Sequence, residues 1–224
     1  MTTPRSAAPG CTPTWMLPRC QRYVLLHEIG RGGYGSIQRG IDSLTNRKVA
    51  IKRQQIGSKS CEREFACLSA LAPYPHPNVI VMLDYFVKAS VPKELYTVYA
   101  LVDSTLWHLY KSDLVRERRL SDSRMWSYMR DVMEGLSHMH SLGIVHGDAS
   151  LVNMLLTDDT VQVADMGSAN SAHQFFISDV VSTWYVGAPE ATLRVPELSA
   201  KIDLWAWGIM TYMMHTGVCD WLTQ

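Results

Sequence analysis

Three polar side chains between residues 148 and 165 could together carry out the transfer of a phosphoryl group. Asp148 ends the string His146-Gly147-Asp148, Asn153 follows it, and Asp165 opens the string Asp-Met-Gly after a short hairpin pattern. Such a reaction needs a carboxylate to orient the attacking hydroxyl, and oxygen ligands that hold magnesium between nucleotide phosphates. Each residue alone is typical of a turn or a cap. Their order and spacing indicate a phosphoryl-transfer site.

A glycine cluster and a lysine precede this stretch. Gly30, Gly32 and Gly35 lie between two strand patterns, where glycines let the backbone approach phosphates without obstruction by side chains. A strand rather than a helix follows them, which disfavours a dinucleotide-binding fold. Lys52 ends the apolar strand Val-Ala-Ile-Lys, and Glu64 lies on the next helical pattern. A lysine in such a strand is rarely buried unpaired, so we predict a phosphate-binding Lys52 held by Glu64.

The periodicity around these residues changes from strand-like to helical near residues 100–104. Strands are predicted over residues 23–30, 36–42, 47–54, 80–86 and 94–102, with a helix over 61–71 between them. A long helix is predicted over 121–143, capped by Ser121 or Ser123 and stopped by Gly143. Strands over 153–157 and 161–165 and a buried helix from Lys201 complete the pattern. A strand-rich small lobe followed by a helical large lobe is the expected division.

Bulk composition narrows the class of protein. The 224 residues carry a formal net charge of +0, which calls for neither nucleic acid nor an anionic membrane as a partner. The apolar stretch over 202–214 is too short to cross a bilayer. The scattered five cysteines form no CxxC pair, which indicates reduced thiols and a cytoplasmic or nuclear location. Residues 1–21 are broken by prolines and are interpreted as a flexible leader.

From about Arg22 onward the sequence resembles the eukaryotic protein kinase family. The matching strings, in family order, are GRGGYGSI, VAIK, HPNV, HGDASLVN, DMG, APE and DLWAWG. WYVGAPE and ELYTVYALVDSTL are most similar to the cyclin-dependent kinase branch of the serine/threonine kinases. The resemblance implies an α+β, bilobal fold, with a leader over 1–21, an N-lobe over 22–101 and a partial C-lobe over 102–224.

The resemblance also implies a role for each matching residue. Gly30, Gly32 and Gly35 would cover the ATP phosphates, and Lys52, paired with Glu64, would hold the α- and β-phosphates. Asp148 would be the catalytic base, and Asn153 and Asp165 would bind Mg²⁺. An apolar column linking the lobes, anchored by Asp203, would consist of Leu68, Met82, His146 and Met166. The adenine site would be formed by Ile29, Ile37, Ala50, Leu155, the backbone of Ala100 and Val102, and Tyr99 at its back.

Several positions depart from the family pattern. Gly147 replaces the arginine that receives a phosphorylated activation-loop residue, and Ile177 lies where related kinases carry their phosphothreonine. We therefore expect that loop phosphorylation does not switch this protein in the usual way, although the adjacent Ser178 remains open as a phosphorylation site. Ser150 replaces the lysine that faces the transferring phosphate, and Val152 lies where tyrosine kinases carry a compensating arginine. Nucleotide binding should survive this loss, whereas transfer should be slow. WYVGAPE also lengthens the substrate-docking loop by one residue.

The chain runs only to Gln224, whereas the family continues through several more helices. We expect Trp205, Trp207, Met210, Tyr212 and Met213 to expose an apolar surface. Either the chain is a C-terminally truncated fragment of a longer product, or a partner chain covers that face.

Three functions remain open from the sequence. The leading one is a protein serine/threonine kinase that transfers the γ-phosphate of ATP to a protein substrate with the help of Mg²⁺. The alternative is a pseudokinase, a nucleotide-binding interaction module. A small-molecule kinase is disfavoured by the APE string and the docking loop. No helix matches the family's cyclin-binding motif closely, so no cyclin is predicted.

Overall fold

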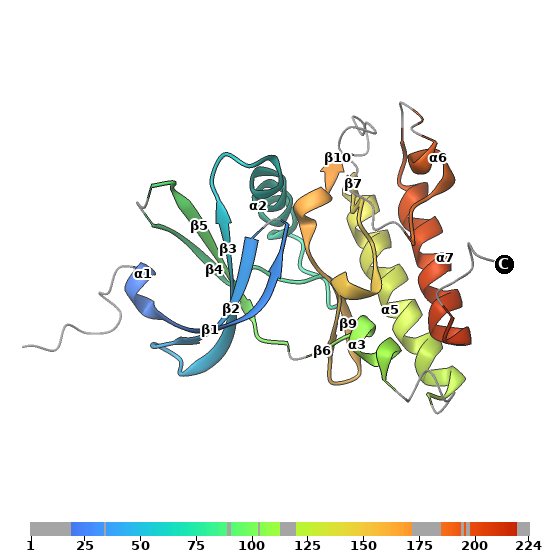
Figure 1. Ribbon diagram of the computed structural model, residues 1–224, viewed down its shortest axis with the longest axis horizontal. Coiled ribbons are helices and arrows are strands. Elements are labelled where there is room, and N and C mark those ends of the chain that lie inside the picture. The colour runs from blue at the N-terminus through green and yellow to red at the C-terminus, as the bar shows by residue number, and fades with distance from the viewer. Residues whose placement is uncertain are drawn as a thin grey trace, which may run out of the picture. The chain divides into compact units, whose positions relative to one another are not determined.

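The computed structural model describes residues 19–33, 35–88, 91–102, 104–112, 120–171, 185–193, 195 and 198–218. These residues form two compact units (Figure 1): residues 19–55 with Leu83–Leu101, and Ile56–Met82 with residues 102–218. The predicted leader lies outside the described residues up to residue 18, while residues 19–21 begin a short helix, α1 (Arg19–Arg22). Residues 56–82 group with the second unit, whereas the sequence divides the lobes at 101/102 alone; the domain ranges stay a prediction.

The first unit is built on a five-stranded antiparallel sheet of order β1-β2-β3-β5-β4. Its strands are β1 (Tyr23–Gly32), β2 (Gly35–Asp42), β3 (Arg47–Gln55), β4 (Asp84–Lys88) and β5 (Glu94–Ala100). All five predicted strands are present. The fourth strand is shorter than predicted and begins at Asp84 instead of Ile80. The reason is that Ile80 belongs to the second unit, where its amide donates to the carbonyl of Val163.

One face of this sheet forms the core of the first unit. Its buried side chains alternate along the strands, as the period of two requires, and are Tyr23, Val49, Ile51, Phe86, Tyr96 and Val98. The Phe86 ring stacks on Tyr23 and on Tyr96, with centroids 5.8 and 4.9 Å apart. Ala50 and Lys52 lie on the opposite face of β3.

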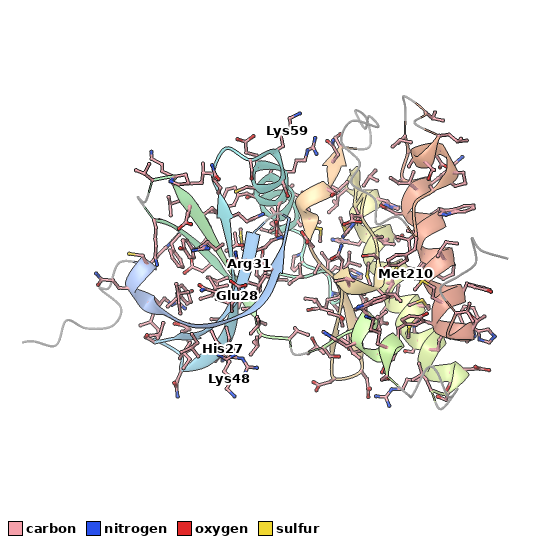
Figure 2. The ribbon with its side chains drawn as sticks, in the orientation of Figure 1. His27, Glu28, Arg31, Lys48, Lys59 and Met210 are labelled. Carbon is pink, nitrogen blue, oxygen red and sulfur yellow. The ribbon has the colours of Figure 1, made fainter. Side chains whose placement is uncertain are left out.

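An ion-pair network ties α1 to the sheet. Arg22 binds both carboxylate oxygens of Asp42 at 2.8 and 2.7 Å, and its third nitrogen lies 3.4 Å from Asp84. The Arg22 guanidinium holds the pKa of Asp42 well below its usual range. Asp42 also accepts from the turn that follows β2, at the Leu44 amide and the Thr45 hydroxyl. By contrast, the Glu28–Arg31 pair on β1 is exposed to solvent (Figure 2) and contributes little to stability.

The second unit is mainly helical. Its helices are α2 (Lys59–Leu71), α3 (Leu106–Lys111), α5 (Asp122–Ser141), α6 (Pro189–Thr192) and α7 (Lys201–Thr216), with 3-10 turns η2 (Leu151–Asn153) and η3 (Met166–Ser168). Its short strands are β6 (Ser104–Thr105), β7 (Ile144–Val145), β8 (Met154–Thr157), β9 (Thr160–Val163) and β10 (Asn170–Ser171). They pair in the orders β6-β8-β9 and β10-β7.

The long helix α5 is the centre of this unit. The Ser121 hydroxyl accepts from the Arg124 amide at 3.4 Å, so Ser121 rather than Ser123 is the N-cap. Met125, Met129, Val132, Leu136 and Met139 recur at helical spacing and are buried along one face. Helix α7 packs beside α5 (Figure 1), and the Trp207 indole donates to the Met129 carbonyl at 2.8 Å.

The segment that follows α2 contacts both α5 and β9. The Asn78 side chain donates to the Val161 carbonyl at 3.0 Å, and the Asn78 carbonyl accepts from Val163 at 2.8 Å. The His76 ring stacks on His138 of α5 with centroids 4.7 Å apart. This segment contains the HPNV string, and it fixes the strand that leads to Asp165.

Helix α7 exposes only part of the apolar surface expected from the sequence. Trp205 and Tyr212 are exposed, together with Leu204, whereas Met210 and Met213 are fully buried (Met210 is labelled in Figure 2). The prediction for the two methionines is wrong because they lie on the side of the helix that faces the unit's own core. Within the described residues, no helix is both long enough and apolar enough to span a membrane.

Gly135 of α5 offers a test of this packing. A Cβ at Gly135 would lie 2.4 Å from the Asn78 carbonyl oxygen and 2.8 Å from a Val163 methyl carbon. We expect Gly135→Ala to lower the free energy of unfolding by about 1–3 kcal/mol, because backbone must move. Urea unfolding followed by circular dichroism measures it.

Gly208→Ala is the matched control. Gly208 is also helical, but a Cβ there meets nothing within 4 Å, so alanine should stabilise the helix by roughly 0.5–1 kcal/mol. Equal stabilisation by both substitutions would contradict the close approach of Asn78 to α5.

Candidate active site

A buried carboxylate holds the predicted catalytic loop. Asp203, in the first turn of α7, is 1% exposed. Its Oδ2 accepts from the His146 amide at 2.8 Å and lies 2.8 Å from His140 Nε2, and its Oδ1 accepts from the Gly147 amide at 3.0 Å. Asp203 thus bonds the backbone of His146, one of the four residues of the predicted column. His140 was not predicted, although its place on the helix shortly before His146 could have suggested it.

The ring of His146 connects the two acidic segments of the site. Nε2 of the fully buried ring donates to the Ala164 carbonyl at 2.9 Å, and Nδ1 accepts from the Asp148 amide at 3.2 Å. A carbonyl can only accept and an amide can only donate, so these partners assign the proton to Nε2. One ring therefore sets the backbone that enters Asp148 and the backbone that enters Asp165.

Asn153 completes this frame. The side-chain Nδ2 of Asn153 donates to the Asp148 backbone carbonyl at 2.9 Å and lies 3.4 Å from Asp148 Oδ2. The backbone carbonyl of Asn153 accepts from the Ala164 amide at 2.9 Å. These bonds bring Asp148, Asn153 and the residue before Asp165 together. That they act as one site stays a prediction.

The oxygen donors of this frame fit a hard divalent cation. With Nδ2 committed to Asp148, the amide oxygen is the atom of Asn153 that remains for a cation. Asp165 has a left-handed backbone (φ 62°, ψ 78°), and its Oδ1 accepts from the Gly167 amide at 3.3 Å. Such a conformation is strained for a residue other than glycine and is frequent at functional sites. Within the described part of the chain, no group of three His, Cys, Asp or Glu side chains could hold a metal ion. Mg²⁺ in proteins usually binds one or two carboxylates together with substrate phosphates and water.

Ser150 and Val152 occupy two very different environments in the same loop. Ser150, which replaces the family's lysine, is 1% exposed, and its carbonyl accepts from the Asn153 amide at 2.9 Å. Val152 is 48% exposed and leaves its side chain outside the packed part of the loop. The loop thus carries no cation at either position, and only residue 152 has room for a long side chain.

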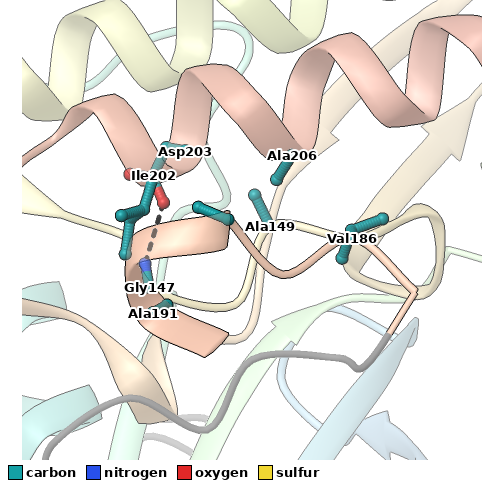
Figure 3. A pocket seen from close by; sticks show the side chains of 8 residues that line it. Gly147, Ala149, Val186, Ala191, Ile202, Asp203 and Ala206 are labelled. Atoms are coloured by element: carbon teal, nitrogen blue, oxygen red, sulfur yellow. Dashed lines mark hydrogen bonds between the residues drawn. The ribbon is translucent and has the colours of Figure 1, made fainter. Parts of the chain in front are cut away.

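Gly147 lies beside a small cavity behind the catalytic loop (Figure 3). The cavity has a volume of about 10 Å³, enough for one water molecule. It is lined by Gly147, Ala149, Val186, Ala188, Ala191, Ile202, Asp203 and Ala206. Gly147 has φ 78°, a conformation that disfavours any side chain. Glycine at 147 therefore avoids strain in this loop, whereas the family pattern has an arginine at this position.

Helix α2 contributes Glu64 and Leu68 to the second unit. Both are buried, and α2 packs against η3, which carries the fully buried Met166. Of the predicted apolar column, Leu68, His146 and Met166 are buried and Met82 is half-buried. Whether the four form a continuous column stays a prediction.

Four predicted nucleotide-binding side chains of the first unit lie on one face of its sheet. Directly opposed residues of antiparallel strands point the same way. The pairs Ile37–Lys52 and Ala50–Tyr99 therefore share a face of the sheet, opposite the core residues Val49 and Ile51. Gly30 pairs with Ile37 across β1 and β2, with Ile29 beside it.

The remaining predicted residues are distributed over both units. Gly32 and Gly35 oppose each other at the β1–β2 turn, and Ala100 ends β5. Val102 and Leu155 belong to the second unit, where Leu155 of β8 pairs with Thr105. Lys52 and Glu64 also belong to different units, so their ion pair and the adenine site stay predictions.

Comparison with known proteins defines the class. Residues 23–223 match the family model for the protein kinase domain, and the chain belongs to that family. It is 30% identical over 204 residues to a cyclin-dependent kinase F-3 of Oryza sativa subsp. japonica (88% of this chain, 45% of the relative). Identity is 30% over 210 residues to human mitogen-activated protein kinase 13 (91% and 55%) and 33% over 196 residues to Arabidopsis thaliana mitogen-activated protein kinase 14 (84% and 52%). The chain thus spans about half the length of these curated relatives.

Gly147→Ala tests the backbone of the catalytic loop. Because φ is 78°, an added Cβ should cost about 1–2 kcal/mol in the free energy of unfolding. Gly143→Ala is the control with the same strain, since its φ is 72° and its Cβ would meet nothing within 4 Å. Urea unfolding should show a loss in both, and a greater one at 147 if the bond to Asp203 is disturbed. An unchanged stability of Gly147→Ala would contradict the left-handed loop.

Proposed function

We propose that this chain is an ATP- and magnesium-dependent protein kinase that phosphorylates serine or threonine in a protein substrate. The observation that carries the proposal is the hydrogen-bonded frame of His146, Asp148 and Asn153 with Ala164, held on the buried carboxylate of Asp203. A phosphoryl transfer depends on positioning and on electrostatic stabilisation. The frame supports the proposal because it holds the backbone on both sides of the predicted base and metal ligands.

Each residue has a defined task in this proposal. The Asp148 carboxylate accepts the proton of the substrate hydroxyl and orients its oxygen, while the Asn153 and Asp165 oxygens hold Mg²⁺. Bound Mg²⁺ supplies positive charge that neutralises the phosphate oxygens. Lys52, kept in place by Glu64, binds the α- and β-phosphates. Gly30, Gly32 and Gly35 cover the phosphates; the adenine is bound by Ile29, Ile37, Ala50, Tyr99, Ala100, Val102 and Leu155.

A nucleotide-binding pseudokinase is the second candidate, and the environment of Ser150 favours it. The loop supplies no cation to the transferring phosphate, so any transfer is expected to be slow. Binding of MgATP depends on residues that are all retained. For either function we propose a cytoplasmic or nuclear location.

The exposed apolar stripe of α7 supports a further polypeptide contact in either case. Leu204, Trp205 and Tyr212 are 43%, 37% and 41% exposed on one side of the helix. We propose that this stripe is covered, either by further residues of a longer product or by a partner chain.

Asp148→Ala tests the catalytic proposal. In single-turnover transfer of the γ-phosphate to a peptide library with fixed serine or threonine, we expect a rate lower by about 10²–10⁴ than that of the wild type, because the general base is removed. Asp159→Ala, at an exposed carboxylate in the turn between β8 and β9, is the control and should leave the rate unchanged.

Binding is measured separately by the thermal shift that MgATP produces. A shift in the wild type that is lost in Asp165→Asn, without detectable transfer, would identify the pseudokinase. No shift in the wild type at saturating MgATP would refute both functions.

Val152→Arg should raise the transfer rate. The position is exposed enough for an arginine, and a cation near the developing charge is worth up to about 10²–10³ in rate. We expect an increase of at least about tenfold in single-turnover rate with little change in ATP affinity. Val152→Met is the uncharged control of similar length. Equal rates for the arginine and methionine variants would show that the missing cation does not limit transfer.

A further inference from the structure

Helix α3 packs beside the turn that carries Asn153, and it was not predicted from the sequence. The Thr105 hydroxyl caps it by accepting from the His108 amide at 3.2 Å, and Leu106 is fully buried. The Tyr110 hydroxyl donates to the Gly217 carbonyl at 3.2 Å, which fastens the helix to the end of α7. Helix α3 also packs against η2, the turn that carries Asn153.

The ring of Trp107 is held in place by its own helix. Tyr110 and Lys111 follow it at i+3 and i+4, the spacings that share a helix face. The Trp107 and Tyr110 rings stack with centroids 5.5 Å apart, and the Lys111 Nζ lies 4.6 Å from the Trp107 ring centroid. Contacts within helix α3 alone therefore restrict the orientation of the indole ring.

The segment that Trp107 meets is the substrate-docking loop. The Trp107 ring lies 5.9 Å from that of Tyr185, at an interplanar angle of 19°. Tyr185 opens the described part of the string Tyr-Val-Gly-Ala-Pro-Glu and is 8% exposed. Aromatic pairs at this distance contribute beyond the area they bury.

Val186 and Ala188, which follow Tyr185 in the same loop, are buried among mainly apolar side chains. Ala188 lies in the apolar cluster with Val145, Leu198 and Ile202. Val186, next to Tyr185, lines the cavity of about 10 Å³ at Gly147 and Ala149 (Figure 3). These contacts are made by small apolar side chains, which are less directional than an aromatic stack. The stack on Trp107 is thus a directional contact at the start of the described loop.

We propose that Trp107 is a positioning residue for substrate: by stacking on Tyr185, it fixes the docking loop in the conformation that accepts the peptide. The proposal rests on the proposed kinase function. It assigns the effect to peptide binding, because neither Trp107 nor Tyr185 belongs to the predicted nucleotide or metal site.

Steady-state kinetics of Trp107→Ala test this role with the best peptide from the serine/threonine library. We expect the KM for peptide to rise about threefold to tenfold, the range that a lost aromatic pair supplies, and the KM for ATP to stay within about twofold. Trp107→Phe should restore the peptide KM. Tyr185→Ala should have the same effect as Trp107→Ala, and the double variant should be no worse than either. Trp126→Ala, at an exposed tryptophan of α5, is the matched control and should change neither constant.

Equal changes in both KM values, failure of phenylalanine to restore the peptide KM, or an additive double variant would each overturn the proposal. If no variant and no wild type transfers phosphate, the kinase function fails, and hydrogen exchange decides the positioning role. Increased deuterium uptake by Trp107→Ala confined to residues 185–193 supports it. Unchanged uptake there overturns it.

Discussion

The carboxylate of Asp203 lies at the base of helix α7 with almost no exposure to solvent, and it accepts three hydrogen bonds from the loop and helix around it. A buried charge is costly unless it is hydrogen-bonded. Moving any of the three donors away from the Asp203 carboxylate would therefore destabilise the fold. Two of the three donors are backbone amides of the catalytic loop. The position of helix α7 therefore determines the backbone conformation of that loop. The protein depends on this one carboxylate for the geometry of its site.

From Asp203 the constraint passes through side chains that bond backbone rather than substrate. His146 joins the Asp148 amide to the Ala164 carbonyl, and Asn153 joins Asp148 to Ala164 from the other side. Asn78 fixes the strand before Asp165 through Val161 and Val163. The acidic residues of the site are thus held by a network whose members are mostly buried, and such networks are rigid when fully bonded.

Against this retained frame, two departures from the family pattern affect charge. Gly147 and Ser150 remove two cations, one that receives a phosphorylated loop and one that faces the transferring phosphate. Neither change disturbs the hydrogen bonds to Asp203 or between Asp148 and Asn153. The substitutions therefore remove charge from the loop without changing the hydrogen bonds that hold its backbone, and both proposed functions are compatible with this frame.

The sequence alone determined the features that depend on local periodicity and on residue type. Alternation predicted β1, β2 and β3, helical spacing predicted α5, and the strings around Asp148 and Asp165 predicted one site. Tertiary structure decided what depends on contacts distant along the chain. Examples are the bonding of His140 to Asp203, the burial of Met210 and Met213, the start of β4 at Asp84, and the stack of Trp107 on Tyr185. The physical reason is that a pattern specifies which face of an element is apolar, whereas packing selects the partner that covers it.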